Sequence, residues 1–487
     1  MQNTEINNRI KQATKWSGIT ELAVKLVTPI TNMILARILM PEAFGVVATL
    51  MIVVSFAEIF TDAGFQKYLV QREFSDEQDL QISTNVAFWT NLVFSLLIWA
   101  GICLFAEPIA ALIGSSGSGP AIRVISLEIP ILAFSSIQTA RYRREFAFKG
   151  LFLSQMLTAM VPLVVTVPLA LVFRSYWALV YGTLARHILN AVILTLRSHW
   201  RPRLQYSFGK LKEMLSFSMW TIVENVSIWL TGYVGIFIVG MVLNEHYLGI
   251  YKTAMNTVNG IMNMITAAIL PVLFAGLSRY QNDEPRFQET FFRFQRMTAM
   301  LVLPLGFGMY VFRELGVAIL LGSQWKEAEG FFGLWALTGA LTISTSFLDS
   351  EAFRSKGKPK LSVLSQCLHL AFLIPLLVFC MDKGFGALTL GRSLARLQAV
   401  AVSACIMHFV MKIRFRNVIR NIWPSLLAAT VMAVAGFWLR QIWNHVIWEL
   451  ICVALCVLIY GGVMLLLPAG RRQAAEIPVL RKWLRLE

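Results

Sequence analysis

The sequence predicts an all-α polytopic membrane protein with about 14 transmembrane helices. Of its 487 residues, 57% are hydrophobic and only 14% are charged, whereas a soluble domain carries about 25% charged residues. So few charges cannot cover the surface of a soluble protein of this size, which argues against a soluble enzyme. Two parts of the chain also repeat in the same order, as expected of two parallel helical lobes.

The predicted spans are apolar runs, each long enough to cross a bilayer as a helix, found with a window of about 19 residues. In chain order they are Trp16–Leu39, Phe44–Gln66, Ile82–Phe105, Gly119–Ala140, Leu151–Phe173, Trp177–Leu196, Leu215–Leu243, Tyr247–Leu277, Met297–Leu321, Phe331–Asp349, Leu361–Met381, Gly384–Met411, Ile422–Leu439 and Val446–Leu467. The thirteenth run is short enough to tilt or to lie partly in the membrane interface.

Lysine and arginine residues are concentrated in alternate connections between these spans. Thirty-one lie in the connections on one side and only four in those on the other. Short loops rich in Lys and Arg stay in the cytoplasm, so we expect a multi-pass protein with both termini cytoplasmic. Topology and contact with anionic membrane lipids then explain most of the net charge of +16, and no nucleic-acid partner is needed.

The connections are too short for a second kind of domain. No extracytoplasmic domain fits on the far side, and the sequence has no GxxxxGK[ST] nucleotide-binding loop. The six cysteines lie in apolar runs without a CxxC pair, which is typical of free thiols that act as small hydrophobes. We therefore expect no cofactor, no metal site and no catalytic residue.

Two pairs of segments carry the internal repeat. The segment LMPEAFGVVAT, which begins at Leu39, resembles LNEHYLGIYKT, which begins at Leu243, with a constant offset of 204. The segment ALVYGTLAR, which ends at Arg186, resembles ALTLGRSLAR, which ends at Arg396. Spans one and two thus match spans seven and eight, and span six matches span twelve.

The repeat divides the chain into predicted domains. We expect an N-terminal lobe of six spans over residues 1–196, a cytoplasmic linker over 197–214 and a C-terminal lobe of six spans over 215–411. A further helix pair and a basic cytoplasmic tail occupy residues 412–487. In transporters built from repeats, the substrate site lies between the repeats.

Charged side chains within the spans are the candidate functional residues, because a charge at the bilayer centre costs at least about 2.5–3.5 kcal/mol and normally faces protein or a water-filled cavity. The candidate substrate-binding cations are Lys25, Arg123, Arg186, Lys252, Arg392 and Arg396. The asparagines expected to line the same cavity are Asn32, Asn190, Asn256, Asn259 and Asn263. The acids that are candidates for coupling or gating are Glu21, Glu58, Asp62 and Glu224.

Several of these residues form polar stripes at helical spacing. Glu21, Lys25 and Asn32 share one face of the first span, and Arg186 and Arg396 end the two copies of one motif. This pattern predicts a hydrated cavity between the lobes, with cations that bind an anion. In the alternative interpretation, pairs such as Glu21 and Lys25 neutralise each other, and Asn and Ser side chains hold helices together.

The chain also resembles a known family. The runs TDAGFQKYLVQREFSDEQDL, STNVAFWTNL, IRVISLEIPIL, ARYRREFAFK and YWALVYGTLAR are similar to the polysaccharide-transporter branch of the multidrug/oligosaccharidyl-lipid/polysaccharide (MOP) exporter superfamily. Its Wzx-type members flip lipid-linked oligosaccharides. The resemblance extends through the twelfth span and carries no catalytic motif.

The resemblance implies a V-shaped pair of six-helix lobes that works by alternating access in the bacterial cytoplasmic (inner) membrane. Its cationic cavity would receive the pyrophosphate and sugars of a polyprenyl-pyrophosphate-linked oligosaccharide, a precursor of lipopolysaccharide or exopolysaccharide. A coupling cation or proton, a polysaccharide polymerase and chain-length proteins are further expected partners. Charge supports this interpretation, because guanidinium groups bind pyrophosphate through charge-assisted hydrogen bonds.

Two alternatives remain at this point. A multidrug-type, cation-coupled antiporter of the same architecture would need acids to dominate its cavity, and the cations Lys25, Lys252 and Arg396 weigh against it. A membrane enzyme acting on the same lipid carrier would need catalytic groups on a substantial far-side loop, and these loops are short.

Overall fold

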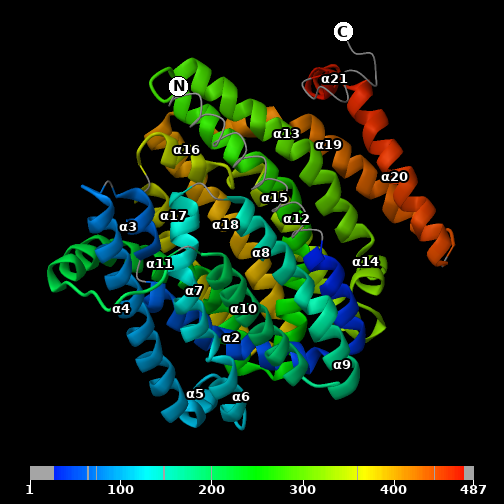
Figure 1. Cartoon of the computed structure of the whole chain (residues 1–487). Helices are drawn as coiled ribbons and strands as arrows, with labels where there is room; N and C mark the ends of the chain where they lie inside the picture. The colour runs from blue at the N-terminus through cyan, green and yellow to red at the C-terminus, as the bar shows by residue number, and fades with distance from the viewer. Residues whose placement is uncertain are drawn as a thin grey trace. The chain divides into compact units, whose positions relative to one another are not determined.

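The computed structural model describes residues 27–62, 65–72, 74–145, 148–198, 200–358, 360–443 and 445–475. All the regular secondary structure in these ranges is helical (Figure 1). The chain divides into two compact units, Met1–Gly249 and Ile250–Glu487. The division falls within one long helix, α12 (Glu245–Arg279).

The first unit begins, in its described part, with a helical segment over residues 27–38. The helices that follow are α2 (Pro41–Asp62), α3 (Phe65–Gln71), α4 (Glu77–Leu104), α5 (Ala106–Leu112), α6 (Gly119–Ile125), α7 (Glu128–Arg144), α8 (Phe148–Val161), the π-helical turn η1 (Pro162–Thr166), α9 (Val167–Phe173), α10 (Trp177–Arg197) and α11 (Phe208–Val242). Their core includes Leu50 and Val54 of α2, Ile122 of α6, Ile129 of α7 and Val180 of α10.

The second unit holds the rest of α12 and the helices that follow it. These are α13 (Glu284–Val311), α14 (Arg313–Leu320), the 3₁₀ turn η2 (Ser323–Ala328), α15 (Glu329–Thr345), α16 (Asp349–Ser355), α17 (Lys360–Met381), α18 (Gly384–Met411), α19 (Phe415–Arg440), α20 (Val446–Leu466) and α21 (Pro468–Ala475). Helix α13 packs on α15 and α19, and α19 and α20 lie side by side (Figure 1).

Ten helical spans within the described residues are long and apolar enough to cross a membrane, or up to 11 if the bent pair α13–α14 is counted. The protein is therefore a polytopic all-α membrane protein. Helices α11 and α12, which cover the predicted seventh and eighth spans, are 35 residues long each. The predicted first span begins outside the described residues, and the total of fourteen stays a prediction.

The ninth span differs from the single run expected over Met297–Leu321. Helices α13 and α14 meet at 91°, because Phe312 leaves the helical conformation with φ −101° and ψ 34°. The bend is held by Arg440 of α19, which pairs with Glu314 at 2.9 Å and donates a hydrogen bond to the carbonyl of Val311.

Candidate functional site

The most distinctive polar cluster of the second unit surrounds Trp335 of α15. The guanidinium carbon of Arg396 lies 3.7 Å from the centre of the Trp335 ring, and its Nη1 donates a hydrogen bond of 2.9 Å to the Trp335 carbonyl. The guanidinium carbon of Arg392, one turn earlier on α18, lies 5.6 Å from the same ring. Two of the predicted cations therefore meet on one aromatic side chain.

A predicted asparagine and a row of aromatic rings fix the position of this tryptophan. The indole Nε1 of Trp335 donates to Oδ1 of Asn259 at 3.0 Å. On its other side Trp335 contacts Phe331, with ring centres 5.4 Å apart, and Phe331 stacks on Tyr251 of α12 at 4.8 Å. Helices α12, α15 and α18 thus each supply one part of the cluster.

A glycine makes room for the guanidinium group. Gly339 lies one turn after Trp335, and a Cβ built on it would lie 2.9 Å from Nη1 of Arg396. The half-buried Arg396 forms no ion pair with a carboxylate among the described residues. Its charge is stabilised by a ring face and a carbonyl instead, and cation–π contacts of this kind contribute about 0.5–2 kcal/mol.

The other predicted cations that the structure describes lie on helices other than α18. Lys252 is half-buried on α12. Arg123 is exposed, and its Nε donates to the carbonyl of Cys103 at 3.2 Å. Arg186 is exposed on α10, so the two arginines that end the repeated motif have different surroundings. Lys25 lies outside the described residues.

The predicted acids and asparagines are distributed over both units. Glu21 and the side chains of Asp62 and Glu224 lie outside the described residues. Of the asparagines, Asn32, Asn256 and Asn263 are exposed, whereas Asn190 accepts a hydrogen bond of 2.7 Å from Ser154.

An acid–histidine group forms in the first unit. Glu128 of α7 is buried, and its Oε1 lies 2.7 Å from Nε2 of His187 on α10. The other carboxylate oxygen of Glu128 has no hydrogen-bond partner among the described residues. Glu58 of α2 is half-buried and close enough to Glu128 to be influenced by its charge. This group therefore brings two carboxylates and a histidine together in the first unit.

The two copies of the repeated motif contact each other within the first unit. A Cβ built on Gly45 would lie 1.8 Å from the carbonyl oxygen of Glu245, and one built on Gly249 would lie 1.8 Å from that of Pro41. The offset of 204 relates Pro41 to Glu245 and Gly45 to Gly249, so the contact is reciprocal, as at a two-fold axis. His246 Nδ1 lies 2.7 Å from Glu42 Oε1, and these residues are again 204 apart.

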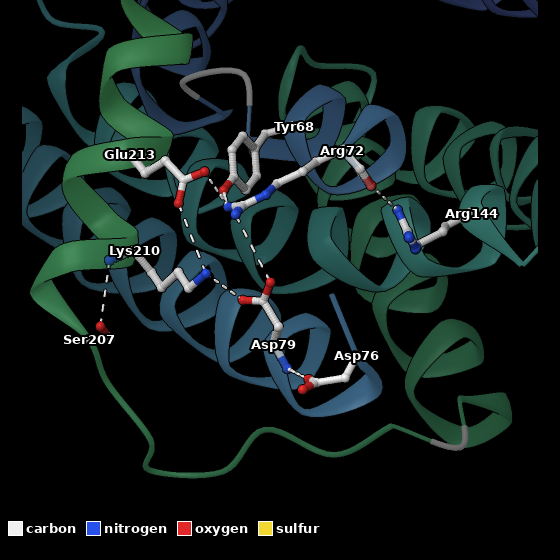
Figure 2. A network of polar contacts seen from close by, with 8 residues as sticks. All are labelled: Tyr68, Arg72, Asp76, Asp79, Arg144, Ser207, Lys210 and Glu213. Carbon is white, nitrogen blue, oxygen red and sulfur yellow. Dashed lines mark hydrogen bonds and ion pairs between the residues drawn. The ribbon is translucent and has the colours of Figure 1, made fainter. Parts of the chain in front are cut away.

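An ion-pair network holds the connections predicted to be cytoplasmic (Figure 2). Arg72 pairs with Glu213 of α11 at 2.5 Å, and Lys210 of α11 pairs with Asp79 of α4 at 2.5 Å. Arg144 of α7 donates to the carbonyl of Arg72 at 2.8 Å. The network ties the start of α11 to the start of α4, so several of the loop cations have structural partners.

Some residues of these groups were not identified from the sequence. Trp335 and Gly339 lie in an apolar run, where a tryptophan and a glycine one turn apart are too common to be informative. Glu42 and His246 could have been identified, because the repeat places an acid and a histidine at equivalent positions of its two copies.

Comparisons with known proteins agree with this architecture. The model of a family described as "Polysaccharide biosynthesis protein" matches residues 34–329. The chain is 28% identical to the succinoglycan biosynthesis transport protein ExoT of Rhizobium meliloti (strain 1021), over 68% of this chain and 67% of that one. It is 20% identical to the lipopolysaccharide biosynthesis protein WzxC of Escherichia coli (strain K12), over 86% of each chain.

Solved structures show the same fold at low sequence identity. The lipid II flippase MurJ, in an inward closed conformation, matches with a TM-score of 0.74 and 14% identity over 92% of this chain and 98% of that one. An inward-facing multidrug resistance MATE family transporter of the MOP superfamily matches with a TM-score of 0.60 and 12% identity, over 82% of this chain and 96% of that one.

Proposed function

Because the chain belongs to the family of polysaccharide biosynthesis proteins, within the MOP superfamily of membrane transporters, we propose that it flips a polyprenyl-pyrophosphate-linked oligosaccharide. Transport would run from the cytoplasmic to the outer face of the bacterial cytoplasmic membrane, with both termini cytoplasmic. The relatives named as a succinoglycan transport protein and a lipopolysaccharide biosynthesis protein support this class of substrate.

The observation that carries the proposal is the arginine cluster on Trp335. An arginine has five N–H donors, and Arg396 uses Nη1 on the Trp335 carbonyl. A guanidinium group held by a ring, without a carboxylate partner in the described part, keeps donors for the two oxygens of a phosphate. A permanent carboxylate partner would compete with such a ligand, whereas an indole ring does not.

We infer that transport proceeds by alternating access between two six-helix lobes of a fourteen-helix protein. The reciprocal glycine contact of the repeated motifs supports this inference, because it packs together two connections predicted to lie on the far side. Opening that contact while the cytoplasmic end closes would expose the substrate to the outer face. Glu58 and Glu128 are the candidate groups for a coupling proton or cation.

A variant series at Arg396 tests the function. We expect Arg396→Gln to be made at the normal level and to fail in flipping, and Arg396→Lys to be intermediate, because lysine keeps the charge and loses the planar fork. The control is Arg416→Gln, an exposed arginine at the start of α19. The measurements are accumulation of the lipid-linked saccharide on the cytoplasmic face and binding of that saccharide to the purified protein, both against quantified membrane protein.

Two outcomes contradict the proposal. Full flipping by Arg396→Gln would show that the substrate's charge is met elsewhere, and loss of flipping that only tracks loss of protein would give Arg396 a structural role. If a deletion strain accumulates no lipid-linked saccharide, the proposed class of substrate is wrong.

A cation-coupled multidrug antiporter is the second candidate. The acid–histidine group of Glu58, Glu128 and His187 favours it, as does the fold similarity to a MATE transporter. Efflux of organic cations that persists in Arg396→Gln and fails in Glu128→Gln would select this alternative.

A further inference from the structure

The face of the first unit that is predicted to be cytoplasmic contains a pocket rich in arginine, which we call the basic pocket. It encloses about 290 Å³, and the residues that line it include Gln81 and Asn85 of α4, Arg141 at the end of α7, Arg197 at the end of α10, and Arg201 and Arg203 of the linker. Glu145 is its only acidic lining residue among those described, and it already accepts a hydrogen bond from Arg141 at 2.9 Å.

The arginines divide into structural and available ones. Nη1 of Arg201 donates to the carbonyls of Thr195 and Ser198 at 2.6 and 2.9 Å, which stabilises the end of α10. The side chains of Arg197 and Arg203 are exposed and form no ion pair with a carboxylate in the described structure. The guanidinium groups of Arg197 and Arg203 are therefore available to bind an anion.

An apolar groove adjoins the basic pocket along α4. It encloses about 500 Å³, and its lining includes Trp89, Val93, Phe94 and Leu97 of α4 together with Leu204 and Tyr206 of the linker. Leu97 is 64% exposed and Leu204 90% exposed. An exposed apolar surface of this kind marks a site of contact with a membrane, a ligand or another protein.

Helix spacing joins the pocket and the groove into one surface. Gln81, Asn85, Trp89, Val93 and Leu97 follow each other at intervals of four residues on α4, so consecutive members are neighbours and form a stripe that winds gradually around the helix. The stripe is polar at the end of α4 predicted to be cytoplasmic and apolar where the helix enters the membrane. A tryptophan at the change from polar to apolar is typical of the membrane interface.

The linker is fixed on this stripe by hydrogen bonds. The backbone N–H of Arg203 donates to Oδ1 of Asn85 at 3.2 Å, and Nε1 of Trp89 donates to the carbonyl of Arg203 at 2.9 Å. The hydroxyls of Thr90 and Tyr206 lie 2.8 Å apart. A linker held in this way presents its arginine and its leucine without a further ordering cost.

From this juxtaposition we propose that the basic pocket and the apolar groove together bind one anionic glycerophospholipid of the cytoplasmic leaflet. Its phosphodiester head would lie between Arg197 and Arg203, and an acyl chain would follow Val93 and Leu97. Basic pockets between transmembrane helices on the cytoplasmic side bind anionic head groups in this manner. The pocket is at the lower end of the roughly 300–1,000 Å³ of ligand sites, so it suits a phosphate head better than an oligosaccharide.

The test is a lipid titration of the purified full-length protein by native mass spectrometry. Phosphatidylglycerol and phosphatidylcholine share their acyl chains and differ in charge. We expect the double variant Arg197→Gln/Arg203→Gln to bind phosphatidylglycerol roughly 25-fold more weakly, from a contribution of about fivefold for each arginine near a membrane surface, with phosphatidylcholine binding unchanged. Leu97→Asn, in the groove, should weaken the binding of both lipids.

The matched control is Arg143→Gln, an exposed arginine on the last turn of α7 that does not line the pocket. It should leave phosphatidylglycerol binding within about twofold of the parent, and thermal unfolding of all variants monitors the fold. Parent-like binding by the double variant, or an equal loss in the control, overturns the proposal.

Competition identifies the source of the phosphate. Inorganic pyrophosphate should compete only weakly because it has no acyl chain, and competition as strong as that of phosphatidylglycerol would show that the groove contributes nothing. If a polyprenyl diphosphate displaces phosphatidylglycerol at equal or lower concentration, the site belongs to the transported substrate and the assignment to a phospholipid is wrong. Flipping measured in the same variants is a separate readout, so the proposed transport function stands or fails independently.

Discussion

The reciprocal contact of the repeated motifs predicts that an alanine at Gly249 destabilises the state in which these two helix starts are packed together. A Cβ on Gly249 would lie 1.8 Å from the carbonyl oxygen of Pro41, and contacts of Cβ atoms below 3.0 Å essentially do not occur. The starts of α2 and α12 must therefore separate by more than about 1 Å, with the strain of an overpacked interface. The blocking atom belongs to the backbone, so no side-chain rotation relieves the clash.

Overpacking of this kind costs about 1–3 kcal/mol, which corresponds to a shift of about 5- to 150-fold in a two-state equilibrium. Thr49 is 1% exposed and lies one turn beyond Gly45 on α2, so a cysteine there reports on opening. In a background without the six native cysteines, a membrane-impermeant maleimide added from outside should label Thr49→Cys at least about fivefold faster when Gly249→Ala is present.

The reciprocity gives this prediction an internal check. Gly45→Ala should act like Gly249→Ala, because its Cβ would lie 1.8 Å from the carbonyl oxygen of Glu245. The control is Gly232→Ala in α11, where a Cβ would meet nothing within 4 Å. Unchanged labelling in Gly249→Ala, or an effect at only one of the two glycines, would refute the reciprocal contact.

Three further predictions concern packing, ion pairs and topology. A Cβ on Gly182 would lie 1.9 Å from the hydroxyl of Thr166 in the π-helical turn, so Gly182→Ala should lower the free energy of unfolding by about 1–3 kcal/mol. Adding Thr166→Ala to this variant should restore part of the lost stability. If the two substitutions instead destabilise the protein additively, this packing is contradicted. Asp79→Asn removes the acid that pairs with Lys210 at 2.5 Å. Because the network is partly exposed, thermal unfolding should show a loss of stability of at most about 1 kcal/mol, and the control Asp283→Asn should show no change. A larger loss of stability would mean that the network is shielded from solvent. Cysteines at Glu245 and Lys326 should be labelled from outside and one at Lys358 only after permeabilisation, whereas labelling of Lys358 in intact cells would refute the predicted topology.

Hydropathy predicted the ends of a helix well where the helix has no polar extension beyond its apolar run. Helix α18 has the predicted bounds, Gly384–Met411. Helix α11 begins at Phe208, before the predicted Leu215, because Ser207 caps it by accepting from the backbone N–H of Lys210 at 3.5 Å. Helix α13 begins at Glu284 behind the cap Asp283, well before the predicted Met297. Polar helix extensions are invisible to a hydropathy window, but capping residues mark them.

The sequence predicted the charged residues of the candidate site but not the side chains that they contact. Helical spacing identified Arg392, Arg396 and Asn259, which the structure brings to Trp335. The spacing could not distinguish a cation that faces an aromatic ring from one that faces a carboxylate, because that depends on which helix packs opposite. Glu128 was not among the candidate residues, and its partner His187 likewise lies on another helix.

The difference between these two groups has a physical consequence for the proposed transport. In the first unit a buried carboxylate is paired with a histidine, a type of side chain that often serves proteins as a proton shuttle. In the second unit a guanidinium group lies on the face of a tryptophan ring, which balances its charge without a carboxylate. A guanidinium group without a carboxylate partner suits recognition of an anionic substrate, and an acid–histidine pair suits coupling to a proton. Within the proposed function, we therefore expect Arg396 of the second unit to bind the phosphate and Glu128 of the first unit to take part in coupling.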